Sequence, residues 1–190
     1  MNFESLLAIW FGSPDEPGYG KPQPKWFTKN SSFDQQLHSQ FFDLYKQAAT
    51  GHLDPWKESP LSCLALIILL DQFPRNVFRG QPLAFATDEQ ALNYAMLAVK
   101  RGYDRQLLPL ERWFIYLPFE HSESLAHQQQ SVELFLTLKD DPDSASAIDY
   151  ALRHLEVIER FGRFPHRNSI LNRPNTPEEE EFLSQPGSSF

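Results

Sequence analysis

The sequence is poor in the residues that define several protein classes. It contains one cysteine in 190 residues, so no disulfide can form within the chain and no cysteine-based zinc site is expected. That cysteine, Cys63, lies in an apolar segment, which predicts a buried and unreactive thiol. The 17 basic residues are outnumbered by 25 acidic ones, and the formal net charge of −8 argues against a nucleic-acid partner, which would need a basic surface.

The sequence also lacks a long hydrophobic run. The longest uninterrupted apolar stretch, residues 64–70, has seven residues. A helix needs about 20 such residues to cross a bilayer. The first residues contain no basic leader before the short apolar segment 6–11. These features predict a cytoplasmic location and no membrane partner.

Aromatic residues, in contrast, are abundant at 14% of the chain, with 16 phenylalanines. A chain of this length buries roughly 70% of the surface of its unfolded form, so it can build a full hydrophobic core. Apolar residues recur every three or four positions, and no segment alternates apolar and polar residues as a strand would. We therefore expect an all-α fold with a single domain over residues 1–190.

Turn-forming residues and helix caps divide the chain into helices. Proline and glycine are dense in residues 12–30, which predicts a surface loop. The nearly all-apolar segment 59–73 predicts a central helix surrounded by the others, and Pro74 is expected to end it. A capping box at Thr87 and a cap at Ser122 predict two further helix starts. The other predicted helices cover residues 3–10, 31–50, 109–117, 142–161 and 177–183, and the last of these belongs to a terminal helix and tail of residues 174–190.

Two similar sequences follow the central helix and the last long helix. The first is Phe73-Pro74-Arg75-Asn76 and the second is Phe164-Pro165-His166-Arg167-Asn168. In each, the phenylalanine is expected to fill the core while the proline ends the helix and holds the next residues in a rigid turn. Alternatively, the arginine and asparagine serve only the helix end, by neutralising its dipole and satisfying its carbonyl groups. The sequence leaves both interpretations open.

Arginines are concentrated around the second of these sequences. Residues 153–173 contain five arginines and two glutamates in an otherwise acidic chain. Arginine can hold a carboxylate or phosphate with two parallel hydrogen bonds, which lysine cannot do, so this pattern predicts a site for a small anionic ligand. In the competing interpretation, Asp71, Glu111, Glu120 and Glu123 pair with the arginines and leave none for a ligand. The predicted ligand-binding residues are Arg75, Asn76, Arg79, Arg163, Arg167 and Asn168.

Three histidines are candidates for proton transfer at this site. His166 is adjacent to an arginine, and the neighbouring cation favours its neutral form. His121 precedes a predicted helix start, and His154 shares a helix face with apolar residues, which predicts partial burial. A carboxylate would orient the imidazole. Because metal-ligand spacings, glycine-rich phosphate loops and nucleophile elbows are missing from the sequence, no metal and no cofactor is predicted. The predicted catalytic residues are His166, His121, His154, Asp71 and Glu120.

Several longer strings are similar to those of one known family. They are LIILLDQFPRNVFRG, AFATDEQALNYA, ERWFIYLPFEHSE and HLEVIERFGRFPHRN, followed by TPEEEEFL near the end. With these strings the chain resembles, over nearly its whole length, a bacterial family of unknown function, number nine-two-four in the series of such domains. The resemblance implies an all-helical fold of the tetratricopeptide-like superfamily and no established activity. Asn172 stands where the family usually has glycine, and asparagine tolerates the left-handed conformation that glycine would adopt.

Three functions are compatible with these observations. The first is a pocket, lined by arginine and histidine, that binds a small carboxylate or phosphate ligand and carries out proton transfer on it. The second is a tetratricopeptide-like module, formed by antiparallel helices around the central one, that binds acidic peptides. In the third, the same residues form a buried network that only holds the helices together. The many aromatic residues also favour a homodimer.

Overall fold

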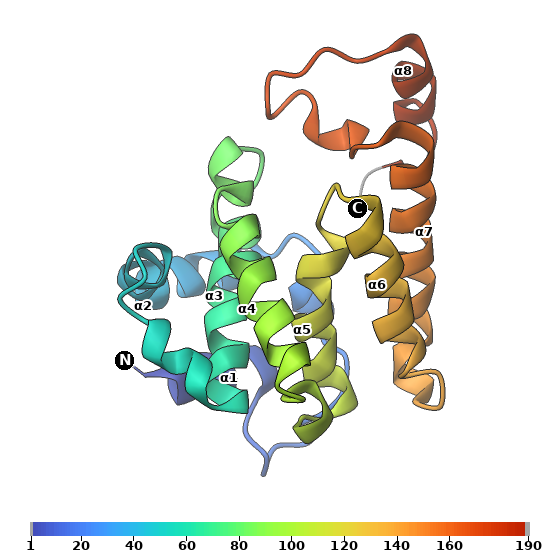
Figure 1. Cartoon of the computed structure of the whole chain (residues 1–190). Coiled ribbons are helices and arrows are strands. Elements are labelled where there is room, and N and C mark those ends of the chain that lie inside the picture. The colour runs from blue at the N-terminus through green and yellow to red at the C-terminus, as the bar shows by residue number, and fades with distance from the viewer. Residues whose placement is uncertain (1, 189–190) are drawn as a thin grey trace.

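Helices make up the regular structure of residues 2–188, the part of the chain that the computed structural model describes (Figure 1). No strand occurs in this range, which confirms the all-α prediction, and no helix in it is long and apolar enough to cross a membrane. Residues 189–190 of the predicted tail lie outside the described residues. The helices are α1 (Phe3–Phe11), α2 (Ser31–Ala49), α3 (Pro60–Val77), α4 (Asp88–Lys100), α5 (Pro109–Glu120), α6 (Leu125–Leu136), α7 (Ala145–Phe161) and α8 (Pro177–Leu183), with short 3-10 turns that include η1 (Pro24–Trp26) and η6 (Pro165–Arg167).

Helix α3 lies at the centre of the fold. The residues from Cys63 to Leu70 have no exposed surface, as the nearly all-apolar sequence predicts. α3 contacts α1, α2, α4 and α5, so the main hydrophobic core forms around it. Cys63 is free and buried as predicted, and burial raises the pKa of its thiol to about 12. The thiol therefore stays protonated at neutral pH.

Helices α2 to α7 each pack against the next helix in the chain, and Figure 1 shows them side by side in that order. α5 also contacts α7. Gly162 ends α7 in a left-handed conformation with φ 67°, as predicted. The chain then forms η6 and α8 at one end of the array (Figure 1). Asn172, in this last part of the chain, has φ 54°, the left-handed conformation expected for it.

Pro74 does not end the central helix, contrary to the prediction. α3 continues to Val77, so Pro74 lies inside it. Proline has no N–H group and cannot bond to the carbonyl oxygen four residues earlier, which is that of Leu70. The Thr87 hydroxyl donates a hydrogen bond of 2.5 Å to this oxygen instead, and it makes no capping bond at the start of α4. A side chain from the following element thus satisfies the carbonyl group that proline leaves unpaired.

Two boundaries around α5 also differ from the prediction. α5 continues through Pro118 and ends at Glu120. α6 then begins at Leu125 with Ser124 as its N-cap, so Ser122 is not the cap. Because α5 is longer and α6 starts later, His121 is the C-cap residue of α5 and does not lie at the start of a helix.

The proline-rich segment 12–30 is more than a surface loop. Trp26, in η1, is 3% exposed, and its ring packs edge-on against Phe114 with 5.1 Å between the ring centres. Proline prevents regular structure here, but it does not prevent a large apolar side chain from reaching the core. The segment therefore contributes to the interior.

Candidate functional site

A cavity of about 620 Å³ lies between α3, α5, α7 and η6. This volume is in the range of small-molecule binding sites. The rest of its wall is largely apolar and includes Trp26, Phe27 and Trp113. Most of the predicted site residues line the cavity, and these are Arg75, Asn76, Arg79, Glu120, His121, His154, His166 and Arg167.

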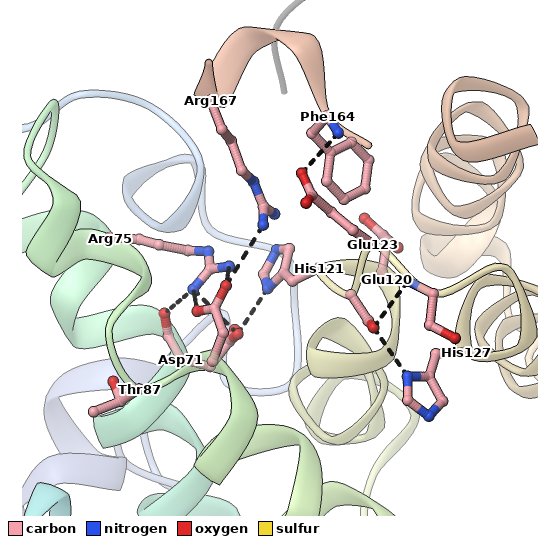
Figure 2. Close-up of polar contacts among 12 residues, drawn as sticks. Asp71, Arg75, Thr87, Glu120, His121, Glu123, His127, Phe164 and Arg167 are labelled. Atoms are coloured by element: carbon pink, nitrogen blue, oxygen red, sulfur yellow. Dashed lines mark hydrogen bonds and ion pairs between the residues drawn. The ribbon is translucent and has the colours of Figure 1, made fainter. Parts of the chain in front are cut away.

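Asp71 and His121 form a hydrogen-bonded pair beside the cavity (Figure 2), with 2.7 Å between Asp71 Oδ1 and His121 Nδ1. Burial opposes ionisation of Asp71, but the nearby Arg75 and His121 outweigh it and hold the pKa of this carboxyl well below its usual value. The carboxylate accepts the hydrogen bond, so Nδ1 carries the proton and Nε2 is the basic nitrogen. Burial and the charge of Arg75 lower the pKa of His121, which keeps the ring neutral at neutral pH.

Glu120 and His154 form a second buried pair. His154 Nδ1 donates to the Tyr150 carbonyl oxygen at 2.8 Å and lies 3.2 Å from Glu120 Oε1. Burial and the charge of Asp71 raise the pKa of Glu120 to about 8, so its carboxyl group is mostly protonated at neutral pH. Burial lowers the pKa of His154 to about 3. Both groups are therefore neutral, and their contact is not a salt bridge.

Arg75 is fully engaged with carboxylates. Its Nη1 and Nη2 atoms donate to the two carboxylate oxygens of Asp88 at 2.7 and 2.9 Å. Nη1 also donates to the Asp71 carbonyl oxygen at 2.9 Å and lies 3.3 Å from Asp71 Oδ1. For this arginine, the interpretation that acidic residues take up the positive charge is correct. Arg75 fixes Asp71 and Asp88 in place and has few donors left for a ligand.

Arg167 is placed differently, between the rings of Phe85 and Phe164. Its guanidinium carbon lies 4.8 and 4.5 Å from the two ring centres. Nη1 is 3.6 Å from Asp88 Oδ2, beyond hydrogen-bond distance, and Nε is buried without a hydrogen-bond partner in the described part of the chain. Burial and the charge of Arg75 lower the pKa of Arg167 to about 10, so it stays charged at neutral pH. The side chain, 8% exposed, is thus a buried cation with unused donor capacity.

The three predicted histidines come together from three elements, α5, α7 and η6. The ring centres of His121 and His154 are 6.5 Å apart, and those of Phe164 and His166 are 5.6 Å apart. Burial and the charge of Arg167 lower the pKa of His166 to about 4. His166 is therefore neutral at neutral pH, as its adjacent arginine predicts. A neutral imidazole has one nitrogen with a free lone pair, which can accept a hydrogen bond or a proton.

Asn76 and Arg79 occupy the end of the cavity formed by α3. The buried Asn76 donates to the Gln72 carbonyl oxygen at 3.1 Å and accepts a bond of 3.3 Å from Arg79 Nη2. The Arg79 side chain is 44% exposed and lies 3.9 Å from Asp34 Oδ2. Asn76 therefore has a structural partner, and Arg79 lies on the solvent side of the cavity.

The structure places the other two predicted ligand-binding residues outside the cavity wall. Arg163 donates to both carboxylate oxygens of Glu179 at 2.6 and 2.7 Å. Asn168 is fully buried and accepts a hydrogen bond of 2.9 Å from Arg173 Nε. Residues 163–183, which we name the C-terminal segment, are thus tied together internally. Glu179 is a buried ion-pair partner rather than only a complement to the dipole of α8, and the bonds from Arg163 lower its pKa to about 2.

Glu123 attaches the C-terminal segment to the loop between α5 and α6. It accepts two hydrogen bonds from Arg173, at 2.8 and 2.9 Å. Figure 2 shows a third, of 2.8 Å, which it accepts from the Phe164 N–H group. Burial opposes its ionisation, but these hydrogen bonds outweigh burial and lower the pKa of Glu123. Glu123 therefore pairs with an arginine, as the competing interpretation of the sequence expects. It holds η6, with His166 and Arg167, against the rest of the molecule.

Comparisons with known proteins agree with the resemblance found in the sequence. A family model described as "Bacterial protein of unknown function (DUF924)" matches residues 6–187. The chain belongs to this family. It is similar to a solved structure of a protein of unknown function, ATU0120, from Agrobacterium tumefaciens, with 41% identity, 96% of each chain covered and a TM-score of 0.85. No curated protein matched the chain.

The main site residue of this DUF924 protein that sequence reasoning missed is Asp88. It is the first residue of α4, where the helix dipole alone explains an acidic side chain. No spacing in the sequence connects it to Arg75 or to Arg167. The aromatic wall was also missed, although two adjacent bulky residues in a proline-rich segment, Trp26 and Phe27, are a signal of inward packing. Within residues 2–188, no cluster of three histidine, cysteine or acidic side chains is arranged to hold a metal ion.

Proposed function

We propose that this cavity binds a small anionic ligand, with a carboxylate or phosphate group directed at Arg167. The observation that carries the proposal is the Arg167 side chain, a buried cation at the cavity wall whose Nε atom has no hydrogen-bond partner among the described residues. An unpaired buried donor on a charged group is costly, and an anion would relieve that cost. Arg75 supports Arg167 indirectly, because it holds the Asp88 carboxylate in place.

The Asp71–His121 pair gives the site a chemical capability. Asp71 fixes the tautomer of His121 so that the basic Nε2 atom can accept a proton from a ligand in the cavity. Glu120, protonated at neutral pH, can donate one. A base and an acid on consecutive residues at the end of α5 suit general acid–base catalysis on the bound molecule.

The alternative functions stay predictions. A cavity bounded by four elements supports a small ligand more than an acidic peptide, which would need an extended groove. The tetratricopeptide-like arrangement, the homodimer and the cytoplasmic location are untested. The bonds of Arg75 favour the third alternative, a structural network, at that residue. Arg167, in contrast, is the residue whose bonding a structural role does not explain.

Binding can be measured with inorganic phosphate, citrate and acetate. We expect at least one of these anions to raise the thermal unfolding temperature of the wild-type protein and to give measurable heats in titration calorimetry. Arg167→Gln should abolish the effect, and Arg167→Lys, which keeps the charge but loses the fork of donors, should weaken binding about tenfold. Arg105→Gln is the control, because Arg105 is an exposed arginine that does not line the cavity. Equal unfolding temperatures with and without every anion would contradict the proposal.

A further inference from the structure

The cavity has two chemically different ends. On α5, Trp113, Leu117 and His121 line it at intervals of four residues, so they share one face of the helix and span about 12 Å along its axis. The side chains therefore change from apolar to polar toward the C-terminal end of the helix. The charged groups Arg75 and Arg167 lie at the end that contains His121 (Figure 2).

Helix α7, which contacts α5, shows the same gradient in its own lining residues. Ala147, Tyr150 and His154 line the cavity and span about 10 Å of the helix. The Trp113 indole N–H donates a hydrogen bond of 2.7 Å to Ser144, just before α7, so the apolar ends of the two walls lie at the same level. His154 is correspondingly level with Glu120, 3.2 Å away. The cavity is thus an elongated slot with one polar end and one apolar end.

Two large side chains that line the slot are well exposed. Phe27 is 58% exposed and Tyr150 is 48% exposed, and both line this cavity. Phe27 stacks on Phe114 with 6.3 Å between the ring centres and an interplanar angle of 4°, which fixes its position. Ordered apolar surface that lines a cavity indicates an apolar occupant.

The charges at the polar end favour a single negative charge on the ligand. The guanidinium groups of Arg75 and Arg167 face the carboxylates of Asp71 and Asp88, so the two positive charges are balanced by two negative ones. A phosphate dianion would add strong repulsion from Asp88, whereas a carboxylate adds one charge and can also accept a hydrogen bond from the protonated Glu120. The arrangement of charges therefore favours a carboxylate over a phosphate dianion.

We infer that the ligand is an elongated amphiphilic monocarboxylate, with its carboxylate at Arg167 and its aliphatic or aromatic body along Trp113, Leu117 and Phe27. This inference rests on the proposed function and specifies the substrate class of the same site. The length of the slot, about 10–12 Å including its polar end, suits a medium-chain or phenyl-substituted acid.

A homologous series of free acids tests the inference. Acetate, butanoate, hexanoate, octanoate and 3-phenylpropanoate would be titrated by calorimetry against wild-type protein, with hexyl phosphate and hexanol as head-group controls. We expect each added methylene group to increase affinity about threefold to fourfold up to the length of the slot. Hexyl phosphate and hexanol should both bind at least tenfold more weakly than hexanoate.

Two variants separate the ends of the slot. Ala147→Phe fills the apolar end, so it should remove the gain from chain length while acetate binds as before. Leu152→Ala is its control, because Leu152 lies on the same helix, is 41% exposed and does not line the cavity. Acetate binding that depends on Arg167 but shows no gain with chain length would overturn this inference and leave the proposed function standing. Failure of every anion to bind would overturn both, and equal binding of hexyl phosphate and hexanoate would refute the assignment of a carboxylate.

Discussion

Glu120 illustrates how burial changes the chemistry of a single residue. The residue is only 3% exposed to solvent, and Asp71 adds a negative charge nearby. Both effects disfavour the ionised form and raise the pKa to about 8 from its usual value of 4.5. The folded protein therefore binds a proton here that the unfolded chain releases between these two pH values. This protonation contributes fully to the free energy of unfolding below about pH 4.5, and the contribution is lost as the pH rises through about 8.

We predict that Glu120→Gln makes stability less dependent on pH in the alkaline direction. Glutamine has nearly the same shape and no proton to lose, so the fall in the free energy of unfolding between pH 5 and 8 should shrink by an amount on the order of a few kcal/mol. Urea unfolding at a series of pH values measures this change in the free energy of unfolding. Glu156→Gln, at an exposed position of α7, should leave the profile unchanged. Identical profiles for wild type and Glu120→Gln would show that Glu120 ionises as in the unfolded chain.

His154 makes stability depend on pH in the opposite direction. Burial lowers its pKa from 6.5 to about 3, so stability from the neutral ring is present above about pH 6.5 and is lost as the pH falls toward 3. Together, Glu120 and His154 give this site a stability maximum in the mildly acidic range, between about pH 4.5 and 6.5. The sequence could identify these residue types, and the apolar face around His154 predicted its burial. The sequence could not predict that the donors of Arg75 would be taken up by carboxylates while those of Arg167 would not, because Asp88 reaches both arginines from another helix.

At the scale of elements, α3 depends on a substitute hydrogen bond at its C-terminal turn. Pro74 removes the N–H group that would bond to the Leu70 carbonyl oxygen, and Thr87 supplies a hydroxyl in its place. This contact connects the end of α3 to the start of α4. Arg75 and Asp88 are the residues that directly follow Pro74 and Thr87, so the same contact sets their positions. The geometry of the charged pair therefore depends on the backbone of both helices.

We predict that Thr87→Val destabilises the protein by about 1–3 kcal/mol, because it leaves a buried carbonyl group unpaired. In a Pro74→Ala background the cost should fall to less than half, since the alanine N–H can bond to Leu70 instead. A double-mutant cycle measured by urea unfolding gives the coupling energy. Thr50→Val is the control, because the Thr50 hydroxyl bonds to carbonyl groups on the exposed end of α2. Equal costs of Thr87→Val in both backgrounds would refute this explanation.

The positions of the helices follow from sequence period and turn residues, but some of their ends do not. Gly162 and Thr176 mark boundaries that the structure confirms, since a left-handed residue and a capping box act locally. Pro74 was wrongly expected to end a helix, because the group that compensates for it lies in a different element. A sequence signal therefore predicts the end of a helix well when the groups that satisfy the helix end are near it in the sequence.

At the scale of the whole molecule, the C-terminal segment is the least firmly packed part of the site. Its apolar contacts form a small cluster around Val157, Ile158 and Phe164, separate from the main core. The ion pair between Arg173 and Glu123 provides much of the remaining attachment, whereas the pair between Arg163 and Glu179 holds the segment together internally. Because η6 belongs to this segment, the positions of His166 and Arg167 depend on it.

We predict that Arg173→Ala loosens the C-terminal segment without unfolding the rest. Removal of Arg173 leaves Glu123 half-buried without its cation, so amide hydrogen exchange in residues 163–183 should accelerate about tenfold or more. Exchange in α3 should stay the same, and affinity for the anionic probes should fall because Arg167 moves with the segment. Arg160→Ala, at an exposed position of α7, serves as the control. Uniform acceleration across the chain would show a global loss of stability instead.

The meeting of the site residues in one cavity was a hypothesis that only three-dimensional structure could test. His121, His154 and His166 are far apart in the chain, and the elements that carry them converge because α5 packs on α7 and the chain turns back after Gly162. The sequence predicted the chemistry of the groups. It could not separate Arg167, which faces the cavity, from Arg163, which faces Glu179, because both follow the same helix within a few residues.

The aromatic wall also provides an optical readout of the cavity. Trp26 and Trp113 line it, whereas Trp10 is fully buried in the core and Trp56 packs against Phe3. A molecule that fills the apolar end will contact these two indoles, which are each only 3% exposed, and will change the intensity of their fluorescence. A molecule too short to reach that end will leave the spectrum unchanged. The intrinsic fluorescence of the unlabelled protein can therefore report how deeply an occupant enters.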